Sequence, residues 1–328
     1  MASLYVTSSE GAAGKTTICA GVAKHLLADG KKVGFMKPTT PDKAIDADGV
    51  FMKRILALGE PIEDICPVIA DPSKIKEAYA KIFSGKDVVI VESMGGQGSG
   101  ESPRKIAEAL GAKAIIVESY SSNYSPSINS YKEWGEYLLG VVLNRVPGSK
   151  LEQVRKELSA KLGGAGIKLL GVLPEDRVLF TLTVGELATH LQGKILSSTE
   201  ETGELVENFM LGAMCVDSGL EYFGRKSNKA VVVRAERPDM QLAALETSTR
   251  CLVLTGTTVP LPAVLLKAKE KKVPLISARE GVGATVANIE GALGKVGFNQ
   301  DRKLPRLIQI MKQNFDFQAI YQGLGLAG

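Results

Sequence analysis

The segment SLYVTSSEGAAGKTT, residues 3–17, joins an apolar run to a small-residue turn and then to a lysine with two threonines. The apolar run SLYVT at 3–7 predicts a short buried strand, and the amphipathic segment 15–29 predicts a helix that ends at Gly30. A glycine-containing turn between a strand and a helix is the context of a Walker A phosphate loop. The N-terminal segment therefore predicts a strand, loop and helix unit that binds a nucleotide.

The predicted phosphate loop is the run GAAGKTT. Glycine lets backbone N–H groups approach a phosphate closely, and the N-terminus of a helix favours negative charge. In such loops the lysine neutralises the β- and γ-phosphates of ATP, and the hydroxyl that follows it binds Mg²⁺. The ATP-binding residues predicted from this run are Gly11, Ala12, Ala13, Gly14, Lys15, Thr16 and Thr17, with Thr16 also a magnesium ligand.

The loop departs from the standard pattern at its start. Ser9 stands five positions before Gly14, where G-x-x-x-x-G-K-[ST] has its first glycine. A chance Gly-Lys-Thr at the start of a helix is the alternative interpretation. The coincidence of strand, glycines, lysine and two threonines favours the phosphate loop.

The composition is that of an ordinary globular protein of two domains. The chain has 328 residues, more than a single core usually supports, with 45% apolar and 23% charged residues. Its 40 basic and 36 acidic residues are interspersed, which predicts neither a nucleic-acid nor a membrane partner. The four cysteines lack metal or disulfide spacing, and no secretory signal or long apolar span is present. We therefore expect a cytoplasmic protein with buried free thiols.

Strands and helices alternate through the first half, which predicts a parallel sheet. The run DVVIVE at 87–92 is continuously apolar, as in strands that are covered on both faces. The pattern changes after 171–174, and a polar stretch at 197–203 precedes further strands and helices. The predicted fold class is α/β, with a parallel-sheet P-loop domain at 1–178 and a second, smaller α/β domain at 179–328.

The stretch VTSSEGAAGKTT at 6–17 resembles the opening of dethiobiotin synthetase, whose phosphate loop runs V-T-G-T-D-T-x-V-G-K-T, with Ser8 here at the position of its glycine. Five further matches follow in the same order, namely KKVGFMKP (31–38), DADGV (46–50), VVIVESMGG (88–96), GVVLNRVP (140–147) and LLGVLPED (169–176). The resemblance covers about the first 175 residues and implies a dethiobiotin synthetase-like P-loop domain.

The resemblance implies the catalytic and metal-binding residues. The lysine matching Lys37 faces the carbamate and the transferred phosphate, so Lys15 and Lys37 are the implied catalytic residues. The acids matching Asp48 and Glu92 help Thr16 to hold magnesium, and together they supply the hard oxygen ligands that Mg²⁺ prefers. Without the resemblance, Asp48 would be a helix-start residue, Lys37 a solvated lysine and Glu92 a polar strand end.

Two further features follow these strands. Asn144 matches an asparagine that reads the adenine edge in the family, and this role is favoured over the alternative, a turn residue. The run GGQGSG at 95–100 comes after Glu92 and is either a second anion-binding loop or a flexible connection.

The second half resembles a DRTGG domain, the module that follows a dethiobiotin synthetase-like domain in many long phosphate acetyltransferases. The resemblance lies in TVGELATHLQGKIL (183–196), FMLGAMCVDSGLEYF (209–223), ERPDMQLAALE (236–246) and CLVLTGTTVPLP (251–262). The eponymous Asp-Arg-Thr is altered at 236–239, which leaves Arg237 without a matching ligand role. Because the chain ends here, the resemblance implies a stand-alone relative that lacks acetyl-transfer chemistry.

Two functions are compatible with this sequence. One is an ATP-dependent ligase that phosphorylates a carboxylate or carbamate of an unknown small-molecule acceptor. The other is a regulatory, nucleotide-sensing module with weak or no hydrolysis and a separate regulatory ligand. Relatives of this class pair their P-loop domains, so we expect a homodimer or a higher homo-oligomer. The signature lysine of dimeric deviant-Walker ATPases falls at Glu10, so the loop supplies no lysine in trans.

Overall fold

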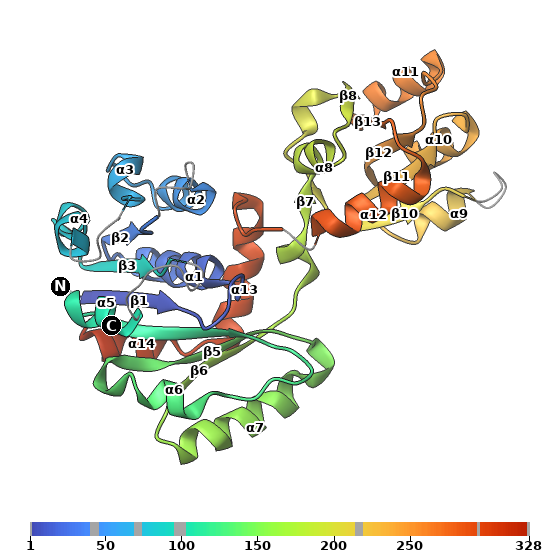
Figure 1. Ribbon diagram of the computed structural model, residues 1–328. Coiled ribbons are helices and arrows are strands. Elements are labelled where there is room, and N and C mark those ends of the chain that lie inside the picture. The colour runs from blue at the N-terminus through green and yellow to red at the C-terminus, as the bar shows by residue number, and fades with distance from the viewer. Residues whose placement is uncertain are drawn as a thin grey trace. The chain divides into compact units, whose positions relative to one another are not determined.

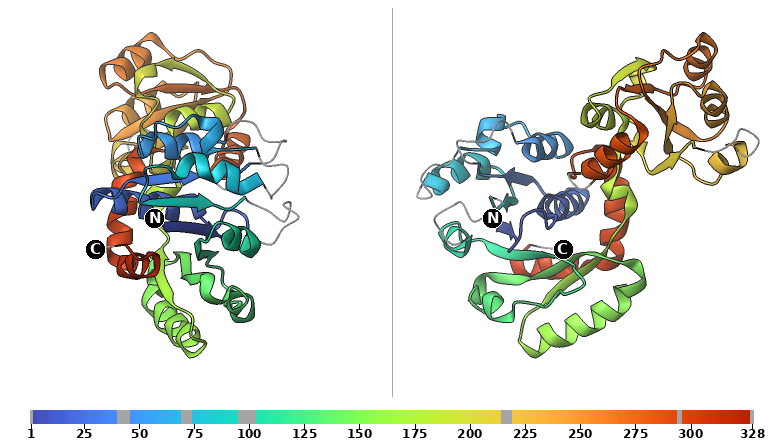
Figure 2. Two further views of the ribbon diagram at one scale, coloured as in Figure 1. Left: turned by 90° about the vertical axis from the view of Figure 1, so that its left-hand side faces the viewer. Right: turned by 45° about the vertical axis from the view of Figure 1, so that its right-hand side comes forward.

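The computed structural model describes residues 2–39, 46–68, 74–94, 103–213, 219–293 and 296–326. The chain forms two compact units. Unit 1 contains residues 1–176 together with 298–328, and unit 2 contains residues 177–297 (Figure 1). Both termini therefore belong to unit 1, as the views in Figure 2 also show.

Unit 1 contains a six-stranded sheet in which all paired strands are parallel, in the order β2-β3-β1-β4-β5-β6. Its strands are β1 (Ala2–Thr7), β2 (Val33–Met36), β3 (Val88–Glu92), β4 (Lys113–Ser119), β5 (Leu138–Val146) and β6 (Leu169–Pro174). Every residue of β1, β2 and β3 is buried, as expected for strands that have helices on both faces. The predicted parallel α/β sheet is confirmed.

Helices connect these strands on the two faces of the sheet (Figure 1). Val141 and Leu143, which point to one face of β5, pack with Leu158 and Leu162 of the helix that follows. The described helices of unit 1 are α1 (Lys15–Ala28), α2 (Ala47–Ile55), α3 (Ile62–Ile65), α4 (Ile75–Phe83), α5 (Pro103–Ala109), α6 (Ile128–Lys132), α7 (Leu151–Gly164), α13 (Leu304–Asn314) and α14 (Phe317–Leu324). The sequence patterns above did not identify α7 or α14.

The C-terminal segment belongs to unit 1, whereas the sequence placed it in the second domain. Phe315 forms a bridge to Gly171 of β6, and the backbone N–H of Asp316 donates to the carbonyl of Leu170 at 2.7 Å. The Phe317 ring stacks on His25 of α1 with 3.6 Å between ring centroids. The predicted domain range 179–328 is therefore wrong for residues 298–328. The reason is that the apolar face of α13 is buried against α1 and β6, which are distant in sequence.

Unit 2 is the smaller α/β unit that the sequence predicted. Its five-stranded sheet has the order β10-β11-β12-β13-β8, with only β8 antiparallel, and apolar clusters cover both faces. The strands of this sheet are β8 (Lys194–Ser197), β10 (Asn208–Leu211), β11 (Lys229–Arg234), β12 (Thr249–Thr255) and β13 (Leu275–Ala278). Two further strands of unit 2, β7 (Leu182–Thr183) and β9 (Leu205–Val206), pair antiparallel with each other. Its described helices are α8 (Val184–His190), α9 (Gly219–Gly224), α10 (Pro238–Leu245), α11 (Pro262–Glu270) and α12 (Val282–Leu293).

The structure also bears on possible membrane spans and on the cysteines. None of the helices in the described ranges combines the length and the apolar character that a membrane span needs. Cys19, Cys66 and Cys251 are buried free thiols, as expected, whereas Cys215 lies outside the described residues.

Candidate functional site

The loop between β1 and α1 adopts a backbone conformation that explains its glycine. Ala12 and Gly14 have positive φ angles of 59° and 97°. A Cβ atom on Gly14 would lie 2.3 Å from Nδ2 of Asn144, and L residues rarely adopt this φ, so a larger residue would be strained there. Gly14 caps α1 without a side-chain hydrogen bond from the described residues. The first N–H groups of the helix thus face the place where a phosphate is expected.

The two serines that replace customary glycines have partners of their own. The Lys15 ammonium donates to Ser8 Oγ at 3.1 Å, and Ser9 Oγ donates to Glu118 Oε2 at 2.8 Å. Burial lowers the pKa of Lys15, and the charge of Glu92 partly offsets this effect. The departure from the standard pattern therefore adds hydrogen bonds within and beside the loop.

Thr16, Asp48 and Glu92 meet at one point, as the sequence predicted for a magnesium site. Thr16 Oγ1 donates to Glu92 Oε1 at 2.8 Å and lies 3.2 Å from Asp48 Oδ2. Thr16 is in the first turn of α1, Asp48 is in the first turn of α2, and Glu92 ends β3. Because Val6 of β1 pairs with Glu92, the carboxyl ends of the two strands bring these elements together.

Lys37 follows β2 directly and lies among three carboxylates. Its ammonium is 3.2 Å from Glu92 Oε1 and 3.3 Å from Asp46 Oδ1, and it donates a short hydrogen bond to Asp48. Burial lowers the pKa of Lys37, but the charges of Glu92, Asp48 and Asp46 together outweigh burial and raise it above its ordinary value. Lys37 is therefore a permanent positive charge, only 9% exposed, at the edge of the phosphate loop.

The donor set fits a magnesium ion. Glu92 is 2% exposed, and its Oε2 atom has no hydrogen-bond partner among the described residues. Burial raises the pKa of this carboxyl, and the Lys37 ammonium partly offsets that effect. No cluster of three His, Cys, Asp or Glu side chains in the described part of the chain is suited to a metal by itself. Mg²⁺, however, commonly takes only one or two carboxylates and completes its shell with phosphate and water.

Asn144 holds the phosphate loop from behind. It lies on β5 opposite Ser119 of β4, and its Nδ2 donates to the Ala13 carbonyl at 3.0 Å. Its Oδ1 accepts from the backbone N–H of Arg145 at 3.0 Å. Adenine would have to use the second amide hydrogen and the second lone pair of this side chain. Reading of adenine by Asn144 therefore stays a prediction, while its contact with the loop is observed.

Sequence reasoning missed two carboxylates of this site. Asp46 caps α2, where it accepts from the N–H groups of Asp48 and Gly49, and it also pairs with Lys37. An aspartate two residues before a helical Asp-Gly was the available signal for this cap. Glu118 accepts from Ser9 and from Tyr131, and no local pattern indicated it. The glycine-rich run at 95–100 lies outside the described residues.

Burial of the Glu118 carboxyl beside the phosphate loop has a testable effect on stability. Burial raises the pKa of its carboxyl above the ordinary 4.5. The folded state therefore binds the proton more tightly than the unfolded chain, so ionised Glu118 costs stability as pH rises above 4.5. We expect Glu118→Gln to raise Tm at pH 7–8 by about 2–4 °C, the shift that roughly 1 kcal/mol produces in a domain of this size.

The pH dependence of this effect is its control. At a pH below 4 the carboxyl is protonated in both states, so Glu118→Gln and the wild type should have equal Tm values in a scan by calorimetry. A Tm difference that stays constant from pH 4 to 8 would contradict the assigned cause.

The arrangement of strand, glycine-containing turn, lysine, threonine and strand-end acid defines the P-loop class of nucleotide-binding proteins. Residues 2–181 match the family model described as AAA domain, and residues 186–292 match the DRTGG domain. The first match covers more than half of the residues of the chain. The chain therefore belongs to this AAA domain family, and a DRTGG domain follows the AAA domain. The predicted order of a P-loop domain and a DRTGG domain is confirmed.

Relatives of two kinds share these segments. The chain is 22% identical to a phosphate acetyltransferase of Nitratidesulfovibrio vulgaris over 355 aligned positions, which cover 95% of the chain and 50% of that protein. It is 26% identical to the hydrogenobyrinate a,c-diamide synthase of Mycobacterium tuberculosis over 197 positions, 55% of the chain and 41% of that enzyme. The chain thus spans half or less of the length of these two relatives.

Among solved structures, the MinC:MinD complex of Aquifex aeolicus aligns with 55% of the chain and 84% of the matched chain, at 21% identity and a TM-score of 0.39. The CBS and DRTGG domains of Clostridium perfringens pyrophosphatase align with 42% of the chain and 69% of that structure, at 13% identity and a TM-score of 0.32.

Proposed function

We propose that unit 1 binds ATP with Mg²⁺ and transfers the γ-phosphoryl group to an anionic oxygen, a carboxylate or carbamate, of a small acceptor. The observation that carries this proposal is the position of Lys37. A buried ammonium at the edge of the phosphate loop, held by Asp46, Asp48 and Glu92, has no use in binding the nucleotide base or sugar. A charge placed there stabilises the negative oxygens that develop during phosphoryl transfer.

The other residues have complementary roles in this proposal. The N–H groups at the start of α1 and the Lys15 ammonium bind the phosphates, since both lie in the first turn of the helix. Moving Lys15 from Ser8 to a phosphate exchanges one neutral acceptor for a charged one, which strengthens the hydrogen bond. Lys37 positions the acceptor oxyanion against the γ-phosphate and offsets the repulsion between the two anions.

Thr16, Asp48 and Glu92 would hold the magnesium ion, and Glu92 Oε2, which has no hydrogen-bond partner among the described residues, is an oxygen open to it. Bound Mg²⁺ supplies charge neutralisation at the β- and γ-phosphate oxygens. We expect Glu92→Gln to weaken binding of the magnesium complex of ATP while binding of metal-free ATP in excess EDTA changes little. Calorimetric titration in the two buffers separates the effects.

Lys15 tests the nucleotide half of the proposal. We expect Lys15→Ala to weaken Mg-ATP binding by about 10–100-fold, because one hydrogen bond to a charged group contributes roughly 1.5–3 kcal/mol. Isothermal titration calorimetry measures the dissociation constant directly, and ligand-induced stabilisation in a thermal-shift assay checks it.

Lys24 provides the matched control, because it lies on the same helix and donates to the carbonyl of Ile55, away from the loop. Lys24→Ala should bind ATP as the wild type does. Retention of full ATP affinity by Lys15→Ala would contradict the assignment of the phosphate loop.

A second candidate function is a nucleotide-sensing module without turnover. It is favoured by the match of 95% of the chain, through both units, to only half of a phosphate acetyltransferase. Single-turnover assays with γ-labelled ATP separate the two functions. Label that moves to product only when bicarbonate and a diamino acid are present supports phosphoryl transfer, whereas tight ATP binding with no transfer or hydrolysis supports sensing.

A further inference from the structure

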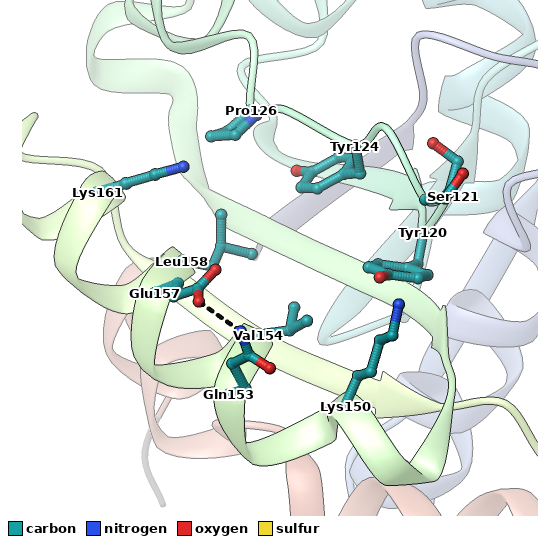
Figure 3. Close-up of a pocket in the computed structure, with 11 residues that line it drawn as sticks. Tyr120, Ser121, Tyr124, Pro126, Lys150, Gln153, Val154, Glu157, Leu158 and Lys161 are labelled. Carbon is teal, nitrogen blue, oxygen red and sulfur yellow. Dashed lines mark hydrogen bonds between the residues drawn. The ribbon is translucent and has the colours of Figure 1, made fainter.

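A second cavity lies in unit 1, between the segment 120–126 after β4 and helix α7 (Figure 3). It has a volume of about 200 Å³. It lies on the sheet face that α6 and α7 cover, because Val141 and Leu143 pack there with the inner side of α7. None of the residues assigned above to ATP or magnesium lines it.

The walls of the cavity suit a flat apolar ring. Tyr120 and Tyr124 are half-buried and form one side, while Val154 and Leu158 of α7 form the other (Figure 3). Aromatic rings prefer offset or edge-to-face contacts with other rings, which two tyrosines on one side of a cavity can provide. A ligand ring between these walls would therefore have aromatic contacts on one side and aliphatic contacts on the other.

The charges of the cavity favour an anion. Lys150 and Lys161 of the lining carry their ammonium groups at two different places around it (Figure 3), and neither pairs with a carboxylate in the described part of the chain. The Lys150 ammonium lies 5.9 Å from the centroid of the Tyr120 ring, within cation–π range. The acidic group of the lining, Glu157, already accepts from Gln153 at 2.9 Å. A carboxylate on the ring would give the lysines the partner they lack.

The size of the cavity restricts the ligand further. Pockets for drug-sized molecules have volumes of roughly 300–1,000 Å³. A cavity of about 200 Å³ is smaller than this range and suits a single ring with one anionic group, not a nucleotide with its sugar and phosphates.

A line of polar side chains connects this cavity to the phosphate loop. The Tyr124 and Tyr131 hydroxyls are 3.5 Å apart, and Tyr131 donates to Glu118 Oε1 at 3.3 Å. The other oxygen of Glu118 accepts from Ser9 at 2.8 Å. A ligand that moves the Tyr124 ring therefore acts on a chain of contacts that ends in the loop.

We propose that this cavity binds a single-ring aromatic carboxylate and that its occupancy changes the affinity of the phosphate loop for nucleotide. The binding of the ring is independent of the function proposed above, whereas the effect on affinity rests on nucleotide binding at the loop. The two parts are tested separately.

Binding is tested on the full chain by ¹⁹F NMR with 4-fluorobenzoate as the probe. We expect saturable binding that benzoate displaces and that neither benzamide, which lacks the charge, nor cyclohexanecarboxylate, which lacks the aromatic ring, displaces at equal concentration. The double variant Lys150→Met, Lys161→Met should weaken binding at least fivefold, whereas Lys156→Met, an exposed lysine of α7 outside the lining, should not. Absence of saturable binding, or equal weakening by Lys156→Met, would overturn the site.

The connection is tested by titrating the non-hydrolysable analogue AMP-PNP with and without saturating 4-fluorobenzoate. We expect at least a threefold change in the AMP-PNP dissociation constant, reciprocated in that of 4-fluorobenzoate, in the wild type. Tyr131→Phe keeps the buried ring, removes the hydroxyl and should abolish the change. An unchanged constant in the wild type overturns the connection. Failure of AMP-PNP to bind at all overturns the proposed function and the connection together, and leaves the binding of the ring standing.

Discussion

Replacing Lys37 by methionine is expected to slow ATP-dependent phosphoryl transfer by about 10²–10³-fold, the loss that follows removal of one preorganised donor to a developing oxyanion. Methionine keeps most of the length of the side chain but leaves Asp46, Asp48 and Glu92 without their shared cation. The pKa of Glu92, already raised by burial, should rise further, because Lys37 is the positive charge that most offsets burial there. The rate constant is measured in single-turnover experiments at saturating ATP.

Two variants make this result specific to the site. Lys37→Arg keeps the charge in a different shape and should recover part of the rate, provided that both variants retain the Tm of a folded protein. Lys86→Met removes a half-buried lysine that pairs with Glu60 at 2.7 Å, away from the loop, and should leave the rate unchanged. If Lys37→Met transfers phosphate at the wild-type rate, Lys37 has only a structural role among its carboxylates.

A large loss of stability is expected when the C-terminal segment loses a buried side chain. Leu307 of α13 is fully buried in unit 1, and truncation of a buried leucine to alanine usually costs about 2–5 kcal/mol. We expect Leu307→Ala to destabilise unit 1 by this amount. Because a two-unit chain need not unfold in one step, hydrogen exchange followed by mass spectrometry is the suitable measurement. Exchange should accelerate in peptides from β1, β3 and β6.

A matched substitution in the other unit provides the comparison. Leu245 of α10 is 1% exposed in the core of unit 2, so Leu245→Ala should accelerate exchange in β11 and β12 and spare β1. Leu266→Ala, at a 70% exposed position of α11, should change neither. Faster exchange in β11 and β12 on Leu307→Ala, with β1 unaffected, would place α13 in unit 2 after all.

Much of the site could be predicted from the buried strands, the phosphate-loop pattern and the family resemblance together. The apolar runs at 3–7 and 87–92 predicted buried strands, the loop pattern identified Lys15, and the resemblance assigned Lys37 and Glu92. In a parallel sheet the carboxyl ends of the strands lie at one edge, so residues 77 positions apart, such as Lys15 and Glu92, become neighbours by topology alone. This reasoning requires no knowledge of side-chain conformation.

Residues whose partners come from other elements could not be predicted in this way. Glu118 lies next to the last residue of β4, and only folding shows that Ser9 and Tyr131 hydrogen-bond to it. The hydrogen bond from the Asn144 amide to the Ala13 carbonyl was not predicted, and the reading of adenine by Asn144 stays a prediction. Neither contact has a local sequence signature, because each depends on the register between neighbouring strands.

The phosphate loop, the parallel sheet and a second α/β domain were thus predicted by sequence patterns, since local hydrophobic periodicity and turn-forming residues specify them, whereas the DRTGG type of the second domain came from the family resemblance. Tertiary structure decided which unit residues 298–328 join, and how three carboxylates share Lys37. The apolar face of α13 shows that this helix must be buried, but it does not show against which unit. Both α1 of unit 1 and the sheet of unit 2 contain apolar residues that such a helix could cover. In the structure α13 packs on α1 at Gly21, where the absence of a side chain leaves the space that Met311 of α13 fills.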